Sequence, residues 1–138
     1  SGVPASRIAV VDVTDAASVK AAAKDCAAFC ICTSAKPSPT GEVKADTGGP
    51  IFGFPNGSPE LVDWMGQKNQ IDACPAGAHV VLCSSMGGTN VNHPLNNLGR
   101  TVNEDGSTSG GNIVKWKRKS EVYLMTKSDL KYTIVHPG

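Results

Sequence analysis

The chain has 138 residues, of which 40% are hydrophobic and 18% are charged, a composition typical of one globular domain. The formal net charge of +1 gives no electrostatic reason to expect binding to nucleic acid or to an anionic membrane surface. Every apolar run is far shorter than the roughly 20 residues that a transmembrane helix requires, so we expect no membrane span.

The N-terminal part of the chain predicts a strand, a helix and a second strand. Residues 7–13 (RIAVVDV) are rich in β-branched side chains, which is typical of a strand buried on both faces. Thr14 or Asp15 supplies the N-cap of an alanine-rich helix, whose apolar and small residues recur at helical spacing as far as Cys26. Residues 27–33 (AAFCICT) predict the second buried strand.

The rest of the chain alternates long loops with further helices and strands. The long segments rich in proline, glycine and polar residues predict loops that are either functional or mobile. In chain order we expect a loop at 36–59, a helix at 60–74, a strand at 79–83, a loop at 89–111, a helix at about 112–127 and a strand at 132–135.

This alternation predicts an α/β fold, a single domain over residues 1–138 with a Rossmann-like parallel sheet and helices on both faces. Ligands of such sheets bind beyond the carboxyl ends of the strands. Three of the predicted strand ends carry small hydroxyl or acidic side chains, so we expect one shared crevice there. The predicted strand ends lie at residues 12–13, 33–35, 84–86 and 136–137.

The five cysteines are odd in number and stand mostly inside apolar runs. Secreted disulfide frameworks use paired cysteines, so we interpret these as buried, reduced thiols of a reducing intracellular compartment. The spacing Cys26-x3-Cys30-x-Cys32 contains no CxxC pair and has no nearby histidine. We therefore predict no metal site.

Three long motifs closely resemble a plant-type, chloroplast-associated group of atypical short-chain dehydrogenase/reductases. These motifs are VDWMGQKNQIDA at 62–73, SMGGTNVNHPLNNLG at 85–99 and GNIVKWKRKSEVYL at 111–124. NmrA-like and isoflavone-reductase-like proteins are looser relatives. VDVTD at 11–15 and ICTSAKP at 31–37 match in register, so the resemblance covers nearly the whole chain. It implies a chloroplast location and a Rossmann domain that binds NADP in preference to NAD, provided that the protein has the glycine-rich turn of the family.

The resemblance implies that the adenosine end of the cofactor lies over the first two strand ends. Asp12 matches the residue that hydrogen-bonds the adenine amino group, with the backbone of Val13 beside it. Thr33, Ser34 and Ala35 match the turn that lines the ribose and pyrophosphate. By itself, Asp12 could equally cap the helix that follows it.

The nicotinamide end is implied at the other two strand ends and on the last helix. Ser85 matches the active-site serine of the family, and Lys117 matches the lysine that binds the nicotinamide ribose. His136 and Pro137 match the loop beside the nicotinamide, where arginine is more usual than histidine. By themselves, Ser85 could satisfy backbone groups at a strand end, and Lys117 could belong to a solvated charge run at 115–119.

Two departures from the family pattern bear on activity. No glycine-rich GxxGxxG turn is present, and Ser1 stands just before what resembles the third strand, so we expect the first βαβ portion of the domain to be missing and both chain ends to be cuts. Ile113 occupies the position of the catalytic tyrosine, four residues before Lys117, and an aliphatic side chain cannot donate a proton. His93 is a weaker candidate for the missing acid.

Two hypotheses follow for the function. The first is an NAD(P)(H)-binding protein with at most weak oxidoreductase activity, in which Ser85 polarises the oxygen of a small carbonyl or enone substrate and Lys117 holds the ribose. The second is a non-catalytic Rossmann-fold scaffold or accessory subunit of a larger chloroplast assembly.

Overall fold

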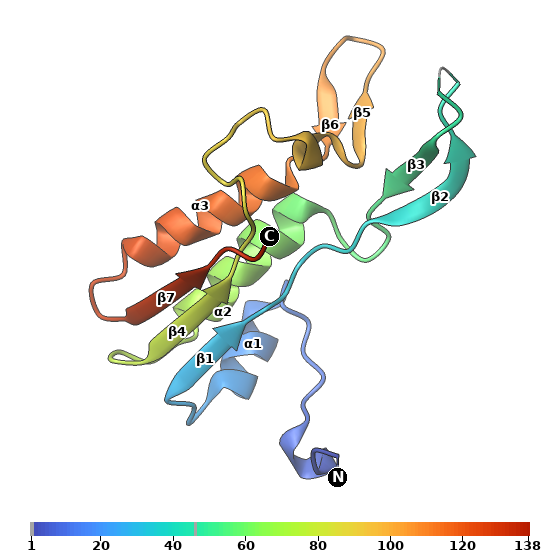
Figure 1. Ribbon diagram of the computed structural model, residues 1–138. Coiled ribbons are helices and arrows are strands. Elements are labelled where there is room, and N and C mark those ends of the chain that lie inside the picture. The colour runs from blue at the N-terminus through green and yellow to red at the C-terminus, as the bar shows by residue number, and fades with distance from the viewer. Residues whose placement is uncertain (1, 46) are drawn as a thin grey trace.

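Three parallel strands form the centre of the fold, in the order β1 (Ala28–Ile31), β4 (His79–Cys83) and β7 (Lys131–Val135) (Figure 1). The computed structural model describes residues 2–45 and 47–138. Ile31 lies opposite Leu82, which in turn lies opposite Ile134. The prediction of an α/β fold with a parallel sheet and flanking helices is confirmed, with each sheet strand within two residues of its expected position.

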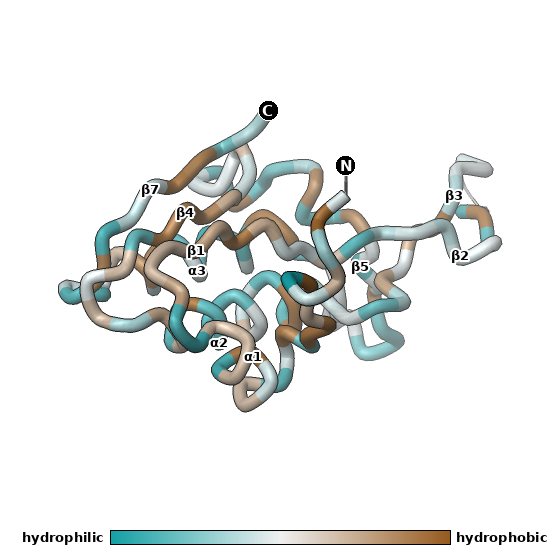
Figure 2. The backbone as a smooth tube through the Cα atoms, turned by 90° about the horizontal axis from the view of Figure 1, so that it is seen from below, coloured by the Kyte–Doolittle hydropathy of each residue, from teal (hydrophilic) through white to brown (hydrophobic). Residues whose placement is uncertain are grey.

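Three helical segments pack together against one face of this sheet (Figures 1 and 2). They are α1 (Ala16–Ala23), a π-helical segment η2 (Glu60–Gly66) that continues into α2 (Gln67–Asp72), and α3 (Ile113–Met125). Val80, Leu82 and Leu124 are fully buried between the sheet and the helices. In the described part of the chain, no helix combines the length and the apolar character that crossing a membrane demands.

The opposite face of the sheet carries no helix in the described residues, so the prediction of helices on both faces is wrong there. Successive side chains of a strand point to opposite faces. Val80 and Leu82 therefore meet the helices, whereas His79 and Cys83 point away from them. This uncovered face also explains a second error. All five cysteines are free as expected, but Cys30 and Cys32, which lie on this face, are exposed rather than buried; Cys26, between α1 and β1, is exposed as well.

The first buried strand, expected at residues 7–13, does not form: residues 8–12 belong to no helix or strand, and Val13 lies in a turn. A short 3-10 helix, η1 (Ala5–Arg7), precedes them, and Val10 is fully exposed. A strand is stabilised by hydrogen bonds to a neighbouring strand, and none of the described strands pairs with this segment. The helix after it starts as expected, because the Asp15 side chain accepts a hydrogen bond from the backbone N–H of Ala17 (2.9 Å).

Both predicted long loops contain β-hairpins, which project near the carboxyl end of the sheet (Figure 1). Strands β2 (Ser38–Val43) and β3 (Pro50–Gly53) pair in the first, and β5 (Arg100–Val102) and β6 (Thr108–Gly110) pair in the second. A 3-10 helix, η3 (Pro94–Asn97), precedes the second hairpin. Asp46 of the first expected loop and Ser1, where a cut was expected, lie outside the described residues.

Candidate functional site

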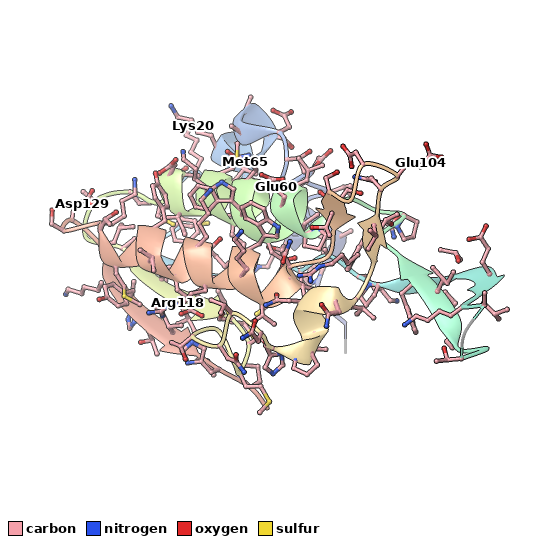
Figure 3. The ribbon with its side chains drawn as sticks, turned by 90° about the horizontal axis from the view of Figure 1, so that it is seen from above. Lys20, Glu60, Met65, Glu104, Arg118 and Asp129 are labelled. Atoms are coloured by element: carbon pink, nitrogen blue, oxygen red, sulfur yellow. The ribbon has the colours of Figure 1, made fainter. Side chains whose placement is uncertain are left out.

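A pocket of about 270 Å³ lies beyond the carboxyl ends of β4 and β7, where parallel α/β sheets bind their ligands. Arg118 contributes to it from α3, on the side of the helix where the strands lie (Figure 3). The loop after β4 and the residue after β7 close it. Its lining consists of Ser85, Met86, Gly87, Gly88, Thr89, Arg118, Glu121 and His136.

The carboxylate of Glu121 is the polar centre of this pocket. Glu121 is completely buried. Its Oε1 accepts a hydrogen bond from Ser84 Oγ and lies 2.9 Å from His136 Nε2. Its Oε2 pairs with Arg118, one helical turn away. Burial raises the pKa of Glu121, but the hydrogen bonds from Ser84, Arg118 and His136 outweigh burial and lower the pKa overall. The pocket therefore contains an ionised carboxylate at neutral pH.

Ser85 stands beside this carboxylate with its hydroxyl group available. The side chain is half-buried, and within the described residues its hydroxyl donates only to the neighbouring backbone oxygen of Met86, at 3.2 Å. Pro137 also contacts this loop, because its carbonyl accepts a hydrogen bond from the Met86 N–H (3.3 Å). Ser85 and His136, both expected near the nicotinamide, thus line the same pocket.

The His93 ring packs against Gly87 in the loop after β4. Gly87 has a φ of +79°, and a Cβ atom on it would lie 2.3 Å from Cδ2 of the His93 ring. The Nδ1 atom of His93 accepts a hydrogen bond from the Leu95 N–H (3.4 Å), which caps the 3-10 helix η3. His93 is therefore a packing and capping residue, and it is not among the side chains that line the pocket.

Lys117, expected to bind the nicotinamide ribose, is paired with a buried carboxylate. Its Nζ lies 2.8 Å from Oδ1 of Asp63, and both side chains are buried. Asp63 Oδ2 also accepts a hydrogen bond from the Ala35 N–H (3.1 Å). The ion pair between Lys117 and Asp63 joins α3 to η2. The hydrogen bond between Asp63 and Ala35 joins η2 to the turn after β1. Sequence reasoning missed Asp63, although its position in the VDWMGQKNQIDA motif was a signal.

The turn after β1 is held by two glutamine side chains. Gln67 Nε2 donates to the carbonyl of Thr33 (2.9 Å), and Gln70 Nε2 donates to the Thr33 hydroxyl (2.8 Å). Gln67 Oε1 is buried without a hydrogen-bond partner in the described residues. Ser34 remains exposed, with only a long bond from its hydroxyl to the Ala35 carbonyl (3.4 Å). Of the polar side chains in this turn, that of Ser34 has the most freedom to contact a ligand.

Asp12 and Val13 lie at the start of the α1 region. The exposed Asp12 carboxylate accepts bonds from the hydroxyl (2.7 Å) and N–H (2.9 Å) of Thr14, which lower its pKa. The Val13 carbonyl accepts a bond from Asn69 Nδ2 (3.0 Å). Val13 and Thr33 also line one apolar pocket of about 350 Å³ between residues 9–13, α1 and β1.

The expected site residues therefore fall into separate groups. Ser85 and His136 share the pocket around Glu121, and Val13 and Thr33 share the apolar pocket. Asp12 and Lys117 are in neither lining. On the side of Ser85 and His136, Gly87 and Gly88 carry no Cβ atoms and Ser85 offers its hydroxyl.

Two plant proteins are similar in sequence to this chain. The chain is 45% identical, over 131 residues, to an uncharacterized chloroplastic protein of Arabidopsis thaliana, and the match covers 92% of this chain and 37% of that protein. It is 38% identical, over 152 residues, to sanguinarine reductase of Eschscholzia californica, with 95% of this chain and 52% of the reductase covered. The chain thus spans about half or less of the length of these curated relatives.

The family profile described as NAD(P)H-binding matches residues 2–138, which is nearly the entire chain. The parallel sheet, with its pocket beyond the carboxyl ends of the strands, is the arrangement that such proteins use for dinucleotides. The chain belongs to the NAD(P)H-binding family.

Proposed function

We propose that the protein is an NAD(P)H-dependent oxidoreductase that reduces a small carbonyl or enone compound, with weak activity because Ile113 stands where a tyrosine would donate the proton. The observation that carries the proposal is the pocket beyond β4 and β7, which joins Ser85 to the Glu121–His136 pair. Membership of the NAD(P)H-binding family and the identity of 38% to a reductase support it.

Two groups of residues would bind the two halves of the cofactor. Asp12, Val13 and the turn Thr33–Ala35 would hold the adenosine half of the cofactor, and Ser85, His136 and Pro137 would lie at its nicotinamide half. The bound dinucleotide would supply the hydride. The Ser85 hydroxyl would polarise the substrate oxygen, because its only bond in the described residues is a local one that a ligand can replace.

His136 is the group in this pocket that could deliver the proton. Its Nε2 is held by the buried Glu121 carboxylate, as a carboxylate orients the imidazole of a catalytic triad. This contact leaves Nδ1 without a hydrogen bond to any described residue. A protonated His136 could therefore donate from Nδ1 to a substrate oxygen and recover the proton from solvent, since its side chain is 46% exposed.

A non-catalytic scaffold or accessory subunit is the second candidate function. It is favoured by the Lys117–Asp63 ion pair, because a lysine committed to a buried partner is not free to bind a ribose. The Val13 carbonyl is likewise occupied by Asn69. For both candidate functions we propose a chloroplast location, because the Arabidopsis relative is named chloroplastic.

Titration of the protein with NADPH and with NADH, followed by nucleotide fluorescence, tests the proposal. Saturable binding together with turnover of small aldehydes or enones would support it, and loss of turnover in Ser85→Ala with binding retained would assign Ser85 to the chemistry. Binding without turnover would favour the accessory subunit. Absence of binding to both nucleotides would overturn the cofactor assignment.

A further inference from the structure

Three thiols lie side by side on the face of the sheet that carries no helix. Cys30 and Cys32 point to this face from β1 and its extension, and their Sγ atoms are 3.5 Å apart. Cys83 ends β4, and the parallel register places it next to Cys32, because Ile31 lies opposite Leu82. The cluster stands directly before the turn at Thr33.

These thiols differ from the remaining cysteines in their surroundings. Cys30 and Cys32 are exposed, whereas Cys74 is half-buried and burial raises the pKa of its thiol to about 11. Cys26 is exposed, but no thiol contact like that between Cys30 and Cys32 is found for it among the described residues. Exposure and a neighbouring thiol are the two conditions for disulfide exchange, and Cys30 and Cys32 meet both.

We propose that Cys30 and Cys32 are a redox-active dithiol that forms an intrastrand disulfide on exchange with a small-molecule disulfide. The Cys30 thiolate attacks oxidised glutathione, forms a mixed disulfide and releases one glutathione thiolate. The Cys32 thiolate then attacks the Cys30 sulfur and releases the second glutathione. Two protein thiols are oxidised, one disulfide is reduced, and the two protons of the protein thiols pass to the released glutathione thiolates.

The environment of Cys32 makes its reaction depend on pH. The hydrogen bond with Cys30 raises the pKa of Cys32, with further contributions from burial and from the charges of Cys30 and Cys83. Cys32 must lose its proton before its thiolate can attack the Cys30 sulfur. Oxidation should accordingly accelerate as the pH rises above the ordinary range of a cysteine.

The backbone allows this bond but does not favour it strongly. Two residues apart on a strand, the Cα atoms are about 6.6 Å from each other, which is near the upper limit of about 6.8 Å for disulfides. Bonds formed at such limits are the labile ones that free thiols reduce again. The structure thus supports a reversible site rather than a permanent crosslink.

The test equilibrates fully reduced protein with oxidised glutathione, blocks free thiols with N-ethylmaleimide and measures intact mass. We expect two of the five cysteines to escape blocking, with a disulfide between Cys30 and Cys32 in the peptide map, and dithiothreitol to restore all five. Cys30→Ser and Cys32→Ser should each abolish the disulfide. Cys26→Ser and Cys74→Ser should leave it intact and serve as matched controls.

Two results would overturn the proposal. One is protein that carries only stable mixed disulfides with glutathione, since the second step would then fail. The other is a disulfide that persists in Cys30→Ser and disappears in Cys83→Ser, which would assign the bond to Cys32 and Cys83 across the strands. Because blocking and mass measurement need no nucleotide, the result is independent of the proposed oxidoreductase activity.

Discussion

The ammonium group of Lys117 and the carboxylate of Asp63 form a buried ion pair, with Nζ and Oδ1 separated by 2.8 Å. The second carboxylate oxygen of Asp63 receives the N–H of Ala35, so one side chain connects α3, η2 and the turn after β1. The Ser120 hydroxyl donates to the backbone carbonyl of the same aspartate. The turn that we assign to the cofactor is therefore tied to α3 and η2 through the side chain of Asp63.

Asp63→Asn should destabilise the protein by about 3–5 kcal/mol, because it leaves the Lys117 ammonium buried without an opposite charge. Urea unfolding followed by circular dichroism measures the change. Asp72→Asn is the matched control, since Asp72 also pairs with lysines but is 34% exposed. Exposed pairs contribute about 1 kcal/mol or less. Equal losses in the two variants would contradict the special role of the buried pair.

The adjacent serines Ser84 and Ser85 should separate stability from activity. Ser84→Ala removes a buried donor to Glu121, so we expect a loss of about 1–3 kcal/mol in unfolding free energy. Ser85→Ala removes only a local bond to Met86 and should leave stability within about 0.5 kcal/mol of wild type. Reductase assays of both variants complete the comparison. If Ser85→Ala retained full turnover, Ser85 would have no part in the chemistry.

The central sheet could be predicted from sequence because its strands are short, apolar and β-branched. Residues 79–83 and 132–135 match β4 and β7 closely, and Asp15 is the N-cap that its residue type indicates. Residues 7–13 have the same local pattern but form no strand, because pairing depends on a neighbour elsewhere in the chain. Local pattern therefore predicted strand propensity and could not predict pairing.

The candidate site was harder to predict, because its key carboxylates are buried. Asp63 and Glu121 have the residue type of solvated helix positions, yet both are completely buried. Their partners Lys117 and His136 come from other elements of the chain. Only the Arg118–Glu121 spacing of three residues was a local signal. The resemblance supplied Ser85 and His136, and the structure adds the carboxylate that holds His136.

Gly87→Ala should weaken the loop beneath Ser85 by about 1–3 kcal/mol, because an alanine would have to keep a positive φ and overlap the His93 ring. His93→Ala removes the overlap but not the backbone strain. The double variant should therefore be more stable than the sum of the single losses predicts, as measured by thermal unfolding. Strict additivity would show that His93 does not pack on Gly87.

Asp72 should make stability depend on pH at the acid end. Burial raises its pKa, but hydrogen bonds from Lys127, Lys68 and Tyr123 outweigh burial and lower the pKa from 3.8 to about 2. The stabilisation is complete above the unfolded pKa of 3.8 and is lost as the pH falls toward about 2. The difference in unfolding free energy between wild type and Asp72→Asn should shrink across that interval. A difference independent of pH would contradict the ion pairs.

Ile113→Tyr should raise reductase activity if the rest of the site is competent. Ile113 is buried in the first turn of α3, one turn before Lys117, so a phenol there would lie on the face of the helix that carries the lysine. A well-placed general acid contributes about 100-fold or more to the rate, whereas overpacking costs about 1–3 kcal/mol of stability.

Ile113→Phe has the same bulk without the hydroxyl and is the control for this prediction. A gain in kcat/KM for tyrosine alone would show that the proton donor is what limits the enzyme. A gain shared by phenylalanine would point to packing of the substrate instead. If Ile113→Tyr binds NADPH and unfolds normally but gains nothing, the Lys117–Asp63 pair withholds the lysine that a catalytic tyrosine needs. That result would favour the accessory subunit over the oxidoreductase.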